Sequence, residues 1–182
     1  DGTGLADILL GNEKVTAVAV DGANRKWLGT EKSGIYLVSE EGLEEIHHFT
    51  DENSPLLSNS ITDISIDGES GIVYIGTEGG LISYKGTAIE GRENYGEVYV
   101  YPNPVRPDHE GDIVITGLVG NVNVKITDIA GNIVFETTAL GGQALWDGRR
   151  FTGEKVRTGV YLVFCTDEDG SQTHVTKLLV IN

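Results

Sequence analysis

The chain has 182 residues, enough for one large domain or two small ones with a buried core. Its 28 acidic residues outnumber its 13 lysines and arginines, and the formal net charge of −15 disfavours nucleic acid and anionic lipid as partners. With 25 glycines, and with Val, Ile and Thr in short runs, the composition predicts many short strands joined by tight turns.

The sequence contains no candidate membrane span and a single cysteine. No apolar run approaches the length of a membrane span, so we expect no membrane span in this chain. The chain contains no Met, so Asp1 is not expected to be a native start, and we expect a processed or truncated piece. Cys165 lies in the apolar run VYLVFC, which favours a buried small hydrophobe over a catalytic thiol.

A phrase of several short strands occurs twice in the first half of the chain, at an offset of 46 or 47 residues. Repeats of this length with several strands each are typical of propeller blades. In the first copy, LEEIHHFT (43–50) is expected to add a fourth strand. The matching segments are VTAVAVDG (15–22), KWLGTE (26–31) and SGIYLV (33–38), and ITDISIDG (61–68), VYIGTE (73–78) and GGLISY (79–84).

The first strand of each copy alternates between two kinds of side chain. The apolar set is expected to pack on a neighbouring blade, and the small or polar set suits an innermost strand beside a water-filled channel. The apolar set is Val18, Val20, Ile64 and Ile66. The small or polar set is Ala17, Ala19, Asp63 and Ser65.

Four further positions define the blade repeat. Trp27 and Tyr74 occupy the same place in the two copies, and we expect both to be mostly buried between sheets. Gly29 and Gly76 follow two residues later, where a Cβ would obstruct close packing of the sheets.

Residues 10 to about 86 resemble the two-component-regulator propeller repeat. The resemblance rests on Asn59 before Ile61, on the two Asp-Gly turns, and on the W-L-G-T and Y-I-G-T phrases. It implies a β-propeller of an outer-envelope protein, most often the periplasmic sensor region of a hybrid kinase of Bacteroidetes. Such propellers carry many blades, so we interpret residues 1–90 as two blades of a truncated propeller.

The pattern changes between residues 86 and 97, and no third copy of the repeat follows. Seven short strands with hairpin turns between them predict an immunoglobulin-like β-sandwich over residues 97–182. The fold class expected for the whole chain is therefore all-β, a partial propeller followed by this sandwich. The candidate strands are 97–101, 112–116, 121–128, 132–138, 143–146, 159–166 and 173–181.

This tail resembles the C-terminal sorting domain of type IX secretion cargo and the related hook-capping sandwich. The resemblance rests on YPNP (101–104), VKITDIAGNIV (124–134), WDG (146–148), GVYLV (159–163) and KLLVIN (177–182). Taken singly, the prolines could block edge pairing and the glycines could serve turns. The resemblance therefore depends on the whole set of motifs in this order. The motif positions are Tyr101, Pro102, Asn103, Pro104, Gly131, Gly159, Tyr161 and Lys177.

No residue is assigned to catalysis, to a cofactor or to a metal. His47 and His48 are adjacent, so on a strand they point to opposite faces and cannot chelate one ion in the ordinary way. Glu40, Glu41, Glu44 and Glu45 are interpreted as a solvated acidic face. The basic stretch Arg149, Arg150, Lys155 and Arg157 indicates local charge balance, with docking to an anionic sugar or acidic partner as the alternative.

A propeller of this repeat type followed by such a tail resembles a cell-surface component of the type IX secretion machinery. In that component the sorting-type domain stays attached. The two resemblances imply a non-catalytic, exported protein of the outer surface or periplasm, either a component or a cargo, that binds machinery proteins or a surface glycan. Two alternatives stay open. One is a periplasmic sensor region of a hybrid two-component regulator that binds a glycan-derived ligand, and the other is a fragment of a propeller enzyme.

Two blades alone would leave apolar faces and strand edges uncovered, because a closed propeller has roughly four to eight blades. The faces bearing Val18, Val20, Ile64 and Ile66 would then drive association. We therefore expect residues 1–182 to self-associate through the blades, while the tail alone stays soluble. Light scattering on the two proteins measures this, and a compact, stable monomer of residues 1–182 would contradict the truncated-propeller interpretation.

Overall fold

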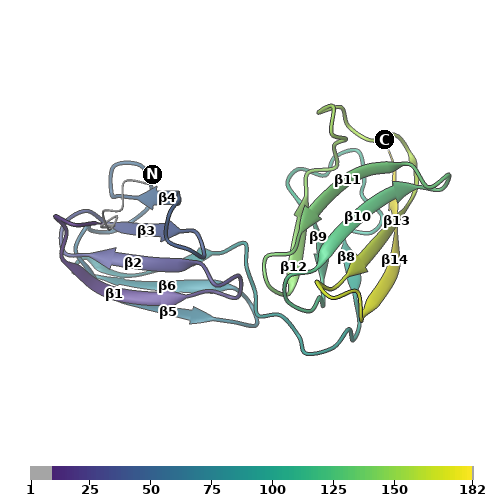
Figure 1. Ribbon diagram of the computed structural model, residues 1–182. Helices are drawn as coiled ribbons and strands as arrows, with labels where there is room; N and C mark the ends of the chain where they lie inside the picture. The colour runs from purple at the N-terminus through teal and green to yellow at the C-terminus, as the bar shows by residue number, and fades with distance from the viewer. Residues whose placement is uncertain (1–9, 182) are drawn as a thin grey trace, which may run out of the picture. The chain divides into compact units, whose positions relative to one another are not determined.

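The computed structural model describes residues 10–181. Their regular secondary structure consists of fourteen β-strands without a helix, which confirms the all-β expectation. The chain divides into two compact units, Asp1–Gly86 and Thr87–Asn182, called here the first unit and the second unit. Figure 1 shows the strands of each unit. Within residues 10–181, no helix is long and apolar enough to cross a membrane.

The first unit contains two antiparallel sheets, one for each copy of the repeated phrase (Figure 1). The register places Trp27 opposite Ala19 in the first sheet and Tyr74 opposite Ser65 in the second, so the two aromatic residues hold equivalent positions. The first sheet has the order β1 (Val15–Val20), β2 (Lys26–Thr30), β3 (Ile35–Val38) and β4 (Glu45–Phe49). The second has the order β5 (Ile61–Asp67), β6 (Ile72–Thr77) and β7 (Gly80–Lys85).

The core of the first unit lies between these two sheets. One face of the first sheet contributes Trp27, Ile35 and Leu37, and one face of the second contributes Ile64 and Ile75. Side chains on a strand alternate between its faces, so the residues between these positions lie on the outer faces of the two sheets. The apolar face of the second copy therefore packs against the Ala17, Ala19 and Trp27 face of the first copy.

This stacking corrects the expectations for Tyr74 and for the alanines of the first strand. Tyr74 is 40% exposed, because it lies on the outer face of the second sheet, away from the core. Val18 and Val20 lie on the outer face of the first sheet and are 59% and 52% exposed, as expected for a chain with only two blades. Ala17 and Ala19 pack against the core instead of lining a channel.

The opposite correction applies to the second copy. Ile64 is buried and Ile66 packs against the core, although both were expected to be exposed if only two blades were present. The first sheet covers them. The two copies therefore use different faces of the same local sequence pattern, according to which sheet lies beside them.

The second unit consists of a four-stranded and a three-stranded antiparallel sheet. Each of the seven strands expected after residue 97 is present, with ends that differ by at most two residues. The first sheet has the order β11 (Ile133–Thr138), β10 (Asn123–Asp128), β13 (Gly159–Thr166) and β14 (Thr173–Val180). The second has the order β12 (Gln143–Trp146), β9 (Ile113–Thr116) and β8 (Tyr99–Tyr101).

The core of the second unit contains the alternating apolar residues of its strands. Trp146 of β12 and Val163 of β13 are both almost fully buried, and the Trp146 ring lies 6.1 Å from the Tyr161 ring. Cys165 belongs to the same core and is fully buried. Desolvation by this burial raises the pKa of its thiol to about 12. The thiol therefore stays protonated at neutral pH, and Cys165 packs as a small apolar residue.

Candidate functional site

Trp27 is the residue around which the first unit is packed. It is fully buried, and its ring lies 6.2 Å from the Phe49 ring and 5.7 Å from the Tyr84 ring of the second sheet. Its indole N–H donates a hydrogen bond to Asp21 Oδ2 at 3.3 Å. A buried Trp needs such a polar partner, and Asp21 supplies it from the turn between β1 and β2.

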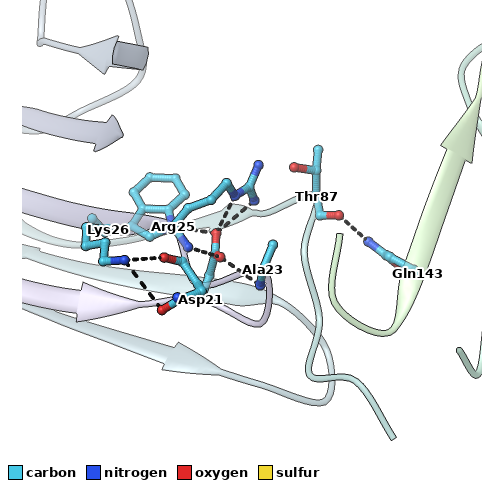
Figure 2. A network of polar contacts seen from close by, with 8 residues as sticks. Asp21, Ala23, Arg25, Lys26, Thr87 and Gln143 are labelled. Atoms are coloured by element: carbon cyan, nitrogen blue, oxygen red, sulfur yellow. Dashed lines mark hydrogen bonds and ion pairs between the residues drawn. The ribbon is translucent and has the colours of Figure 1, made fainter. Parts of the chain in front are cut away.

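Asp21 is the centre of a buried polar network in that turn (Figure 2). Its Oδ1 accepts the backbone N–H groups of Ala23 and Arg25 at 3.0 and 3.1 Å. Its Oδ2 accepts Arg25 Nε–H at 2.8 Å and also lies 2.8 Å from Arg25 Nη2. The side chains of Asp21 and Arg25 are only 3% and 9% exposed, so the carboxylate is a buried charge compensated by donors on both oxygens.

In the sequence, Asp21 was recognisable only as part of an Asp-Gly turn signal, and its ion pair was missed. The signal that could have found it is the opposite charge four residues later, at Arg25. The second copy has Asp67 at the same place, but the register puts Ile72 at the position of the arginine. There the Ser70 hydroxyl donates to Asp67 Oδ2 at 2.6 Å, and this hydrogen bond, the largest cause, lowers the pKa of the Asp67 carboxyl.

The two repeat glycines have different surroundings. A Cβ on Gly29 would lie 2.5 Å from Ile61 Cγ2 in the opposite sheet, so the absence of a side chain allows the two sheets to approach. A Cβ on Gly76 would lie 2.9 Å from the Thr62 hydroxyl oxygen in the neighbouring strand of its own sheet. The expected close packing between sheets therefore applies to Gly29 and not to Gly76.

The sorting-type motif positions at the start of the second unit lie beside the terminal strand β14. Tyr101 ends β8 and is 45% exposed, and the peptide bonds before Pro102 and Pro104 are both cis. Asn103 Nδ2–H donates to the carbonyl oxygen of Lys177 at 3.0 Å. The backbone N–H of Leu179 donates to Asn103 Oδ1 at 3.1 Å. The fold therefore brings together two motif positions, Asn103 and Lys177, that are 74 residues apart in sequence.

The remaining motif positions lie elsewhere in the second unit. Gly131 occupies the turn between β10 and β11 with a φ of +86°, which a glycine adopts without strain. Asp128 supports this turn by accepting the Asn132 side-chain and backbone N–H groups, and these bonds lower the pKa of the Asp128 carboxyl. Gly159 begins β13, and Tyr161 is 4% exposed with its hydroxyl donating to the Arg157 carbonyl oxygen at 2.8 Å.

The two adjacent histidines and Arg149 of the basic stretch contact nearby residues of their own strands and loops. His47 pairs with Leu37 and His48 with Tyr36, so the two imidazoles lie on opposite faces, and the His48 ring stacks on Tyr36 at 3.9 Å. Arg149 of the basic stretch donates to the Gly153 carbonyl oxygen at 2.7 Å. In the part of the chain that the structure describes, no group of three or more His, Cys, Asp or Glu side chains is arranged to hold a metal.

Two small cavities lie in the separate units. An apolar one of about 120 Å³ lies in the first unit beside Phe49, Leu56 and Tyr84. One of about 40 Å³ lies in the second unit beside Val105, His109 and Val180.

In the second unit, Gln143 Nε2–H donates to the Thr87 carbonyl oxygen at 2.8 Å, and this hydrogen bond connects the start of the unit to β12 (Figure 2).

The second unit is similar to a known family of domains. Residues 99–182 match the secretion system C-terminal sorting domain. No curated protein matches the chain. The second unit is therefore similar to the secretion system C-terminal sorting domain.

Among solved structures, the chain is similar to PorZ, an essential bacterial surface component of the type IX secretion system of Porphyromonas gingivalis. The two share 36% sequence identity with a TM-score of 0.67, and the match covers 97% of this chain and 24% of the PorZ structure. The chain thus spans about a quarter of the length of that protein. It resembles the C-terminal part of a PorZ-like protein, as the sequence motifs indicated.

Two extracellular domains from B. thetaiotaomicron also match. The domain of the hybrid two-component system BT3049 is 11% identical with a TM-score of 0.37, and the match covers 98% of this chain and 39% of that one. The domain of the one-component system BT4673 is 11% identical with a TM-score of 0.33, with 97% and 26% covered. At these values the likenesses carry no argument about function.

Proposed function

We propose that this chain is the C-terminal part of a non-catalytic surface component of a type IX secretion system. The observation that carries the proposal is the 36% identity to PorZ, which extends over 97% of the chain and so includes both units. The sorting-type domain in residues 99–182 supports export to the cell envelope. The partners that follow from this role are proteins of the secretion machinery or a surface glycan.

The proposal includes a finer architecture. Residues 1–90 are two blades of a β-propeller, and residues 97–182 are an immunoglobulin-like domain of the sorting type. Two observations support the blades: the equivalent register of Trp27 and Tyr74, and the packing of one repeat sheet on the other. In a closed propeller each sheet buries both faces, so further blades would cover the outer faces that bear Val18 and Tyr74.

Self-association of residues 1–182 belongs to the same proposal. The outer face of the first sheet exposes Val18 and Val20, and the outer face of the second exposes Tyr74 and Leu81. These two faces are the counterparts of the faces that pack together inside the first unit. A head-to-tail contact between two copies would therefore repeat the existing sheet-to-sheet packing.

Removal of the proposed sorting-type domain tests the proposed export. The full-length protein is produced with and without residues 97–182 in a bacterium that has a type IX system, and surface protein is measured by protease accessibility on intact cells. We expect the intact protein at the surface and the shortened protein inside the cell, because the sorting-type domain would be the part that is recognised. Tyr74→Ala serves as a control that leaves the second unit unchanged.

Equal surface amounts of the intact and shortened proteins would overturn the proposed function. The size of the surface protein separates its two versions. A component is expected to retain residues 97–182, whereas a cargo protein is expected to lose them after export.

A further inference from the structure

The segment that contains the YPNP motif forms a continuous ladder of hydrogen bonds with the end of the terminal strand. Asn103 Nδ2–H donates to the Lys177 carbonyl oxygen, and Leu179 N–H donates to Asn103 Oδ1. Val105 then continues the ladder: its N–H donates to the Leu179 carbonyl oxygen at 2.8 Å, and its carbonyl oxygen accepts Ile181 N–H at 2.9 Å. Four successive backbone groups of residues 177–181 are thus satisfied by residues 103–105.

The first two bonds of this ladder come from a side chain. Pro102 and Pro104 have no N–H, so this stretch of backbone cannot donate to a neighbouring strand at those positions. The Asn103 amide presents one N–H donor and one carbonyl acceptor, the same pair that a peptide group presents. It therefore replaces a peptide unit where the prolines interrupt strand pairing.

The ladder lies on an open edge of a sheet. β14 is the last strand in the order β11-β10-β13-β14, so its outer edge would otherwise present unpaired backbone groups. Leu178 and Val180 point into the core and are 1% and 2% exposed, whereas Lys177 and Leu179 face outward. Pairing on both edges fixes the register of residues 177–181 and hence which of their side chains are displayed.

We propose that Asn103 is a positioning residue for the sorting-type domain, which holds residues 177–181 in the register that the secretion machinery recognises. This inference rests on the proposed function of residues 97–182. The partner is a protein of the machinery that contacts the outward side chains of Lys177 and Leu179. Asn103 acts on that contact through the backbone of β14.

The first experiment measures the ladder itself. In the full chain, Asn103→Ala removes both side-chain bonds, and the amide hydrogen of Leu179 loses its acceptor. We expect its exchange with solvent to become about tenfold faster, since a lost hydrogen bond of ordinary net strength changes local opening by about that factor. Asn123→Ala is the matched control, because its amide bonds to Glu136 at 2.9 Å and not to β14.

The second experiment separates positioning from stability. Val134→Ala shortens a buried side chain of β11 that takes no part in the ladder, and it is expected to destabilise the second unit. In the export assay we expect Asn103→Ala to reduce surface protein strongly, and Val134→Ala and Asn123→Ala to leave it near the unsubstituted level. A merely structural Asn103 would instead make export follow the stability of each variant.

Two further results would overturn the inference without affecting the proposed function. One is unchanged exchange of the Leu179 amide in Asn103→Ala, and the other is normal export of that variant while deletion of residues 97–182 blocks export. If deletion does not affect export, the proposed function fails and the inference fails with it.

Discussion

Trp27→Ala is expected to lower the free energy of unfolding of the first unit by about 3–5 kcal/mol, as is usual for removal of a buried Trp. Tyr74→Ala, at the equivalent position of the second copy, is expected to cost about 1 kcal/mol or less. The difference arises because Trp27 is fully buried between two sheets and donates to Asp21, whereas Tyr74 is 40% exposed. Equivalent positions of the two repeats are therefore expected to contribute differently to the free energy of unfolding.

Urea unfolding of both variants measures this difference. Because the chain has two units, amide hydrogen exchange in β2 and β3 should report on the first unit and exchange in β10 and β13 on the second. We expect Trp27→Ala to increase exchange in β2 and β3 and to leave β10 and β13 unchanged. Equal costs for the two substitutions would show that the stacking of the repeat sheets described here is wrong.

Arg25→Met is expected to destabilise the first unit by about 3–5 kcal/mol, because it leaves the buried Asp21 carboxylate without its compensating charge. The network gives this substitution its cost: Arg25 contributes its Nε and Nη2 atoms to Asp21 Oδ2, and both side chains are almost fully buried. The methionine preserves most of the apolar stem of the arginine, so the loss reports mainly on the charge.

A second substitution and a control make the result specific. Adding Asp21→Asn to Arg25→Met removes the unpaired charge and keeps an acceptor for the turn N–H groups, but it replaces Oδ2, the acceptor of the Trp27 indole N–H, by an NH2 group. The double variant is therefore expected to recover only part of the lost stability. Lys14→Met breaks the ion pair of Lys14 with Glu31, which is 2.6 Å long but exposed at both ends, and should have a far smaller effect. Urea unfolding midpoints compare the three variants. If Arg25→Met and Lys14→Met cost the same, burial of the Asp21 network does not matter for stability.

Local patterns in the sequence were sufficient for the strands. The alternation in VKITDI, the turn residues around Gly131 and the repeated W-L-G-T and Y-I-G-T phrases depend on residues close together in the chain. They predicted an all-β fold, the equivalence of the two copies and all seven strands of the second unit to within two residues. The resemblance of the tail to a sorting-type domain was likewise visible, because it rests on short phrases in a fixed order, and residues 99–182 match that domain family.

The partner of each face and each polar group was decided only by the tertiary structure. Trp27 and Tyr74 have the same local sequence position, yet one is buried and the other exposed, because burial depends on which sheet lies beside each face. The pairing of Asn103 with Lys177 depends on the docking of β14 at the edge of a sheet, across 74 residues of chain. A sequence pattern fixes the periodicity of a strand, but contacts between distant segments fix its neighbours, and those contacts determine both the buried Asp21 network and the terminal-strand ladder.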